Sequence, residues 1–143
     1  MPLATEEEWE NDPELKAMRA EFVASFAGRR ETLSAQSLVL ARGKSGDPEF
    51  ESALKTALGI AHKLSGAAET YGFPLLTRAS AALEEWCGNP DLKIRSGADA
   101  SLFAGLLVEM LAQTQQRGKD SSEFASDPRL QKLESAVGAL KPD

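Results

Sequence analysis

The sequence predicts an all-α fold, an up-down antiparallel four-helix bundle with an additional short C-terminal helix. Apolar residues recur at spacings of three and four, the period of an amphipathic helix, and no useful stretch shows the alternation of a strand. Helices of the resulting lengths, joined by short loops, form an up-down bundle. Three Asp-Pro pairs place a good N-cap residue before a proline, as helix starts commonly do: Asp12-Pro13, Asp47-Pro48 and Asp127-Pro128.

The N-terminal region carries the first helix signals. Thr5 and Glu8 have the spacing of a capping box. We interpret Trp9 and the acidic residues 6–8 before it as a frayed end rather than a docking tail. The first long helix follows, and Gly28 is its expected weak point. Its residues at helical spacing are Leu15, Met18, Phe22, Phe26, Leu33, Ser37 and Leu40.

Three further long helices are predicted in the middle of the chain. The second covers about residues 48–71, the third begins after Phe73-Pro74, and the fourth begins near Ala98. The third carries Leu76, Ala79, Leu83 and Trp86, and the fourth carries Leu102, Phe103, Leu106, Leu107, Met110 and Leu111. The residues expected to end helices in a left-handed conformation are Gly43, Gly72 and Gly88.

The C-terminal part is predicted to be a polar loop followed by a short helix. The loop covers residues 117–126, and the helix is marked by Leu130, Leu133, Val137 and Leu140. The whole chain, residues 1–143, is expected to be a single domain with a core of about 13–117 and an extension of 118–143. A complete bundle of this kind is expected to be a monomer.

Composition excludes several classes of function. The chain has 16 Lys and Arg and 22 Asp and Glu, and its net charge of -6 argues against a nucleic-acid partner. No apolar run is long enough for a membrane span, and the acidic N-terminus does not resemble a secretory signal, so we expect a cytoplasmic protein. One histidine, His62, and one cysteine, Cys87, cannot form a usual zinc site or an internal disulfide. Cys87 is expected to be a buried small hydrophobe.

The second predicted helix places its histidine on the face opposite its apolar stripe. His62 is therefore expected to be exposed in mid-helix, with Lys55 and Glu69 on the same face. Gly59 and Gly66 lie one turn before and one turn after it, where each costs the helix about 0.5–1 kcal/mol relative to alanine. They indicate a flat approach to the ring for another protein, or else they are tolerated surface glycines. The apolar stripe consists of Phe50, Ala53, Ala57, Ile60, Leu64, Ala68 and Tyr71.

The segment that carries His62 reads AHKLSGAAETYG over residues 61–72, and five of its residues form a pattern: His62, Leu64, Gly66, Tyr71 and Gly72. This pattern resembles the phosphorylation motif of histidine-containing phosphotransfer (HPt) domains. Ser65 departs from it, because the family usually has Lys or Arg at this position, where a cation would attract the phosphoryl oxygens. The resemblance covers about residues 13–117.

The resemblance implies a phosphorelay carrier. His62 would accept a phosphoryl group from the aspartyl phosphate of a response-regulator receiver domain and pass it to another receiver, and a hybrid histidine kinase is a further candidate partner. No cofactor is expected, because the receiver supplies Mg²⁺. Kinase activity of its own is not expected, because an ATP-binding domain has no room in this chain. The residues around His62 that we expect to form the docking surface and the phosphoryl environment are Lys55, Gly59, Lys63, Ser65, Gly66 and Glu69.

Two other functions are compatible with the sequence. The chain could be a degenerate HPt-like module that docks receiver or kinase domains without phosphotransfer, and Ser65 favours this alternative. It could also be a structural bundle in which His62 has no role.

Overall fold

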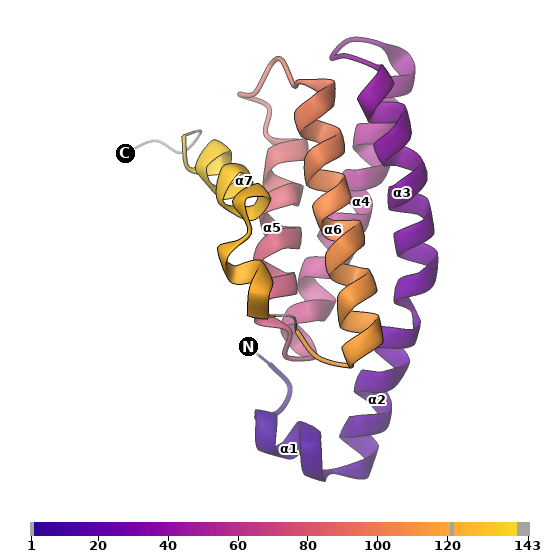
Figure 1. The fold of residues 1–143 in the computed structure, drawn as a ribbon, viewed down its shortest axis with the longest axis vertical. Helices are drawn as coiled ribbons and strands as arrows, with labels where there is room; N and C mark the ends of the chain where they lie inside the picture. Colours follow the sequence, from indigo (N-terminus) through magenta and orange to yellow (C-terminus); the bar gives the residue numbers. More distant parts are fainter. Residues whose placement is uncertain (1, 121, 140–143) are drawn as a thin grey trace.

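The computed structural model describes residues 2–120 and 122–139, and the regular secondary structure in these ranges is helical. Four helices form an up-down antiparallel bundle, in which each helix packs against the one before it and the last closes against the first (Figure 1). These helices are α3 (Phe26–Arg42), α4 (Pro48–Thr70), α5 (Pro74–Gly88) and α6 (Gly97–Arg117). The all-α bundle predicted from the sequence is confirmed.

The apolar stripes of the four bundle helices meet in one core. Burial of such side chains from water is the main force that holds a bundle together. Met18 and Leu102, both counted in the predicted stripes, are not part of it, because Met18 is 40% exposed and Leu102 is 37% exposed. The buried side chains include Phe26, Leu33, Leu40, Phe50, Leu64, Leu76, Leu83, Phe103, Leu107 and Leu111.

The first predicted long helix is interrupted at Ser25 rather than at Gly28. It divides into α2 (Pro13–Ala24) and α3, and Gly28 lies inside α3. The Ser25 hydroxyl donates a hydrogen bond to the Phe22 carbonyl over 2.5 Å. A serine side chain that bonds the preceding turn competes with the helical backbone and bends it, which accounts for the break.

The N-terminal residues form a docked helix, so the predicted frayed end is wrong. Helix α1 (Glu6–Asn11) begins with the capping box that Thr5 and Glu8 predict. Trp9 is only 1% exposed, and its ring lies 6.0 Å from that of Tyr71 between ring centroids. Burial of a large aromatic ring outweighs the tendency of a short terminal helix to fray.

Of the three predicted left-handed helix ends, one is confirmed. Gly72 has φ 78° after α4, whereas Gly43 is extended and Gly88 is the last residue of α5. The other left-handed helix end in the described residues is Gly118, which follows α6 with φ 73°. Gly97 is required for a different reason, because a Cβ there would lie 2.4 Å from the Gly43 carbonyl oxygen. The start of α6 therefore lies directly against the end of α3.

The C-terminal extension covers α5 and α6. The predicted loop contains a 3₁₀ helix, η1 (Ser122–Ser126), because Phe124 is buried against the core. Helix α7 (Pro128–Gly138) follows it, and of the residues predicted to mark this helix, Leu140 lies outside the described residues.

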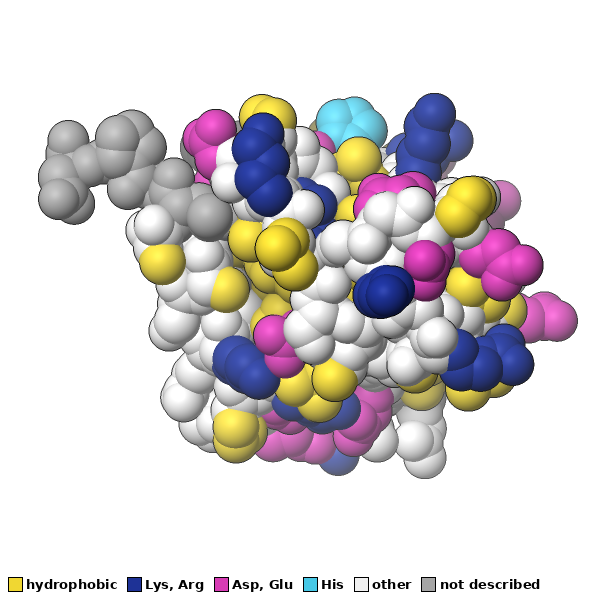
Figure 2. All heavy atoms as spheres, turned by 90° about the horizontal axis from the view of Figure 1, so that it is seen from above, with side chains coloured by type: hydrophobic (Ala, Val, Ile, Leu, Met, Phe, Trp, Pro, Cys, Tyr) yellow, Lys and Arg dark blue, Asp and Glu magenta, His cyan; other side chains and the backbone are white. Residues whose placement is uncertain are grey.

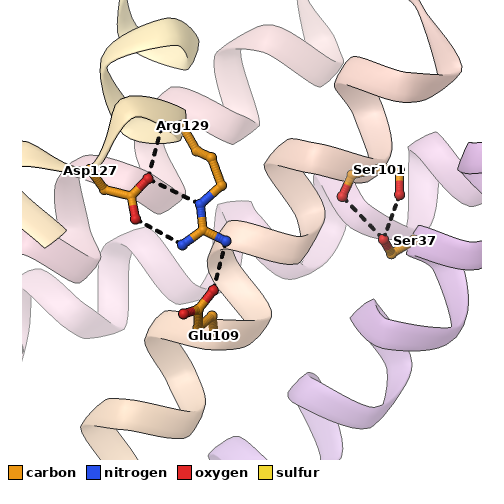
Figure 3. Close-up of polar contacts among 5 residues, drawn as sticks. All are labelled: Ser37, Ser101, Glu109, Asp127 and Arg129. Atoms are coloured by element: carbon orange, nitrogen blue, oxygen red, sulfur yellow. Dashed lines mark hydrogen bonds and ion pairs between the residues drawn. The ribbon is translucent and has the colours of Figure 1, made fainter.

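Arg129 fixes the start of α7 to the bundle (Figure 3). Its guanidinium donates to the Glu109 carboxylate of α6 over 2.6 Å and to both oxygens of Asp127, the N-cap of α7. The hydrogen bonds from Arg129 lower the pKa of Asp127.

In the same view, the hydroxyls of Ser37 and Ser101 lie 2.9 Å apart and join α3 to α6. No helix in the described part of the chain is both long and apolar enough to cross a bilayer.

Asp120 caps the start of α5 from the loop that follows α6. Its carboxylate accepts a hydrogen bond from the Leu75 backbone N–H over 2.8 Å. Burial raises the pKa of Asp120 above its usual value of 3.8, and the hydrogen bond only partly opposes this effect. The folded protein therefore holds a proton on this carboxyl group more tightly than the unfolded chain does.

We expect the Asp120→Asn variant to gain stability relative to the wild type as the pH rises from 4 to 7. A raised carboxyl pKa stabilises the fold at low pH, and this contribution is lost as the pH rises through the folded-state pKa. The asparagine carbonyl still accepts from Leu75 but does not titrate. Urea unfolding of both proteins at several pH values measures their free energies of unfolding. If the value for the variant minus that for the wild type decreases as the pH rises, the expected sign is wrong.

Candidate functional site

The site is centred on His62 in the middle of α4. The apolar stripe of α4 faces the core, with Ala61 and Leu64 fully buried on either side of the histidine in sequence. The His62 side chain is 72% exposed, as the helical periodicity predicts. Figure 2 shows the histidine standing out from the surface, with Lys and Arg side chains beside it. The imidazole is therefore open to a partner protein.

Glu84 of α5 holds the imidazole in one orientation. Its Oε2 lies 2.6 Å from Nδ1 of His62. An ionised carboxylate can only accept a hydrogen bond, so the proton of a neutral ring is held on Nδ1. The lone pair then lies on Nε2, the ring nitrogen that points away from this bond. This arrangement leaves Nε2 as the nucleophilic atom.

Ser65 supports Glu84. Its hydroxyl is 3.3 Å from Oε1 of Glu84 and 3.1 Å from the His62 carbonyl oxygen, and both of these atoms are acceptors. Where the resemblance leads us to expect a cation, the chain thus has a hydroxyl whose single proton is shared between the Glu84 carboxylate and the His62 carbonyl oxygen. Ser65, Glu84 and His62 form one hydrogen-bonded group across α4 and α5.

The other predicted site residues differ in their exposure and in their relation to this hydrogen-bonded group. Lys55 and Lys63 are exposed on α4, and a Cβ added to Gly59 or Gly66 would meet no atom within 4 Å. These glycines therefore have no packing role. Glu69 is exposed two turns after His62, has an interaction of its own, and also lines a separate hollow beside α1. It does not belong to the hydrogen-bonded group.

Cys87 is remote from this chemistry. It is 7% exposed at the end of α5, and burial raises the pKa of its thiol to about 12, an effect that Arg95 partly opposes. A thiol with such a pKa is not a nucleophile near neutral pH. Its predicted role as a buried small hydrophobe agrees with this position. Among residues 2–120 and 122–139, no group of three or more His, Cys, Asp or Glu side chains could hold a metal ion.

Glu84 is the site residue that the sequence analysis missed. Its partner lies 22 positions earlier in the chain, so no local motif connects the two. A signal was nevertheless present, because α4 and α5 form a helical hairpin that turns at Gly72 and Phe73. His62 and Glu84 are equally far from Phe73 along the chain, which places them at the same height in an antiparallel pair. Leu58 and Gly88 follow the same rule and lie in contact.

A family model described as Hpt domain matches residues 17–117. No curated protein and no solved structure gave a significant match to the chain.

Proposed function

Because the chain belongs to the Hpt domain family, whose members are phosphotransfer carriers in two-component signalling, we propose that His62 is its phosphoacceptor. In this proposal His62 accepts a phosphoryl group from the aspartyl phosphate of a receiver domain and passes it to another receiver. The observation that supports it most strongly is the exposed imidazole whose Nδ1 lies 2.6 Å from the Glu84 carboxylate. This bond directs the free lone pair of the ring toward solvent, where a partner would approach.

The transfer step requires no cofactor held by this chain. The Nε2 lone pair of His62 attacks the phosphorus atom, a nitrogen–phosphorus bond forms, and the bond between phosphorus and the aspartyl oxygen breaks. The receiver carboxylate leaves with the electron pair of that bond. The ring, which keeps its proton on Nδ1, becomes positively charged, and the Glu84 carboxylate stabilises this charge. Transfer to the second receiver reverses these steps, and in both directions the receiver supplies Mg²⁺.

The surface beside the ring supports docking of a protein rather than of a small substrate. Gly59 and Gly66 leave the helix flat one turn on each side of His62, although neither glycine is needed for packing. Glycine in a helix costs about 0.5–1 kcal/mol relative to alanine, so an advantage in binding would offset this cost. We assign Lys55, Lys63 and Glu69 to the border of the docking surface.

The proposal also covers the partners, the oligomeric state and the location of the chain. Response-regulator receiver domains are the proposed partners, with a hybrid histidine kinase as a further candidate, and the chain is proposed to act as a monomer in the cytoplasm without kinase activity of its own. The division into a core of about residues 13–117 and an extension of 118–143 stays a prediction.

The alternative function is receiver or kinase docking without phosphotransfer. Ser65 favours it, because a hydroxyl stands at the position where the family usually has Lys or Arg, and this hydroxyl is hydrogen-bonded within the site. In that case the phosphoryl oxygens would receive less stabilisation from this chain.

A labelling experiment distinguishes the two functions. Purified receiver domains of the source organism are phosphorylated with radiolabelled acetyl phosphate, freed of the donor, and mixed with the protein and Mg²⁺. Phosphotransfer predicts loss of label from a receiver and its appearance on this chain in an acid-labile, alkali-stable form. Binding of a receiver without any label on the chain would support the docking module instead.

We expect Glu84→Ala to lower the rate of phosphotransfer about tenfold. A hydrogen bond to a charged group contributes about 1.5–3 kcal/mol, and the partial exposure of this pair reduces that value. Glu84→Gln should have a smaller effect, because its amide oxygen can still accept from Nδ1 of His62 but carries no charge. Rapid-quench measurement of label transfer gives the rates.

Glu49→Ala is the matched control for the Glu84 variants. It removes one carboxylate from an exposed position at the start of α4, far along the helix from His62. Its rate should equal that of the wild type. Equal rates for all four proteins would show that Glu84 does not act on the imidazole.

A further inference from the structure

A shallow hollow lies beside His62, between the start of α3 and the middle of α4. Its volume is about 570 Å³. Lys55, Gly59 and Lys63 line it from α4, while Gly28 and Arg29 line it from α3. A Cβ added to either glycine would meet no atom within 4 Å, so both leave open space for a partner. We call this feature the cationic hollow.

The three cations of the cationic hollow have no carboxylate partner among the described residues. Arg29 donates to the Ser25 hydroxyl over 2.7 Å. Lys55 and Lys63 form no hydrogen bond or ion pair through their side chains with any residue in 2–120 or 122–139. Elsewhere in the chain several cations are each paired with a carboxylate: Arg19, Arg78, Arg117, Arg129 and Lys132.

Charge is distributed unequally around His62. The cationic hollow lies on the α3 side of the ring, whereas Glu84 lies on the α5 side and lines a second hollow together with Glu85. The chain as a whole has a net charge of -6, whereas the lining of the cationic hollow contains three cations and no Asp or Glu. Acidic groups of a partner would be attracted to the α3 side of His62 and repelled from the α5 side.

We propose that the cationic hollow receives acidic side chains of the receiver domain and so determines how the receiver is oriented over His62. This inference rests on the proposed phosphotransfer function and specifies the chemistry of its partner. Carboxylates are the groups that three adjacent cations would bind, and the missing side chains at Gly28 and Gly59 let the partner's backbone come close. Electrostatic attraction of this kind raises the rate of association more than the final affinity, and added salt weakens it.

Charge reversal tests the inference. The first variant carries Arg29→Glu, Lys55→Glu and Lys63→Glu. The control carries Lys16→Glu, Lys44→Glu and Lys93→Glu, three exposed positions outside the cationic hollow. Both variants lower the net charge equally. Association with the receiver that labels the wild type is followed by stopped-flow fluorescence of a dye-labelled receiver, at low salt and at about 0.5 M salt.

We expect the hollow variant to associate at least tenfold more slowly than the control at low salt, with most of this difference lost at high salt. Equal rates for the two variants, while the wild type accepts label, would overturn the inference and leave the proposed function intact. Failure of the wild type to accept label from any receiver would instead contradict the proposed function. Sedimentation measures self-association of the wild type and of both variants. If the wild type and the control self-associate and the hollow variant does not, the occupant is a second copy of this chain, and the inference is overturned.

Discussion

Replacement of His62 by glutamine is expected to abolish labelling of the protein by phosphorylated receiver domains. Glutamine has a similar size and can still bond Glu84, but its amide nitrogen has no available lone pair to attack phosphorus. His62 is the only histidine in the chain, so no neighbouring imidazole can replace it. The measurement is acid-labile, alkali-stable radiolabel on the wild type and on His62→Gln under identical conditions.

Two controls make this result specific. His62 is 72% exposed, so its replacement should change the free energy of unfolding by less than about 0.5 kcal/mol and leave the circular dichroism spectrum unchanged. Phosphoramidate, a small donor that needs no docking surface, should label the wild type but not His62→Gln. Persistent alkali-stable label on the variant would exclude His62 as the acceptor.

Replacement of Trp9 by alanine is expected to destabilise the fold by about 3 kcal/mol, the lower end of the range for a buried tryptophan. Trp9 is 1% exposed, and Arg19 lies over its ring at 5.3 Å. Arg19 also donates to the carbonyl of Gly72 and to Glu6 over 2.9 Å each, which joins α1 to the end of α4. Urea unfolding followed by circular dichroism measures the loss.

Trp9→Phe is the matched control for this prediction. The indole Nε1 of Trp9 has no hydrogen-bond partner among the residues that the structure describes, so phenylalanine keeps an aromatic ring while removing a buried polar group. Trp9→Phe should lower the free energy of unfolding clearly less than Trp9→Ala does. If Trp9→Ala changes the free energy of unfolding by less than about 0.5 kcal/mol, Trp9 belongs to a frayed end, as the sequence alone suggested.

The bundle could be predicted because its signals are local. An amphipathic stripe, an Asp-Pro start or a capping box depends on residues within a few turns of one helix, and each of these features is present in the structure. Predictions that depended on neighbours in space were less successful. The sequence places Trp9 in a frayed end and Phe124 in a polar loop, yet both side chains are buried. Ser25, rather than Gly28, interrupts the first long helix because the Ser25 hydroxyl donates a hydrogen bond to the Phe22 carbonyl, one turn earlier.

The fold class and the exposure of His62 to solvent could both be predicted from the residues alone, because periodicity decides which face of a helix is buried. The surroundings of the imidazole, in contrast, depend on how the helices pack. Glu84 reaches Nδ1 of His62 from α5, and Arg29 reaches the cationic hollow from α3. These contacts depend on the register and separation of neighbouring helices, which the packing of the whole core sets and no single segment encodes.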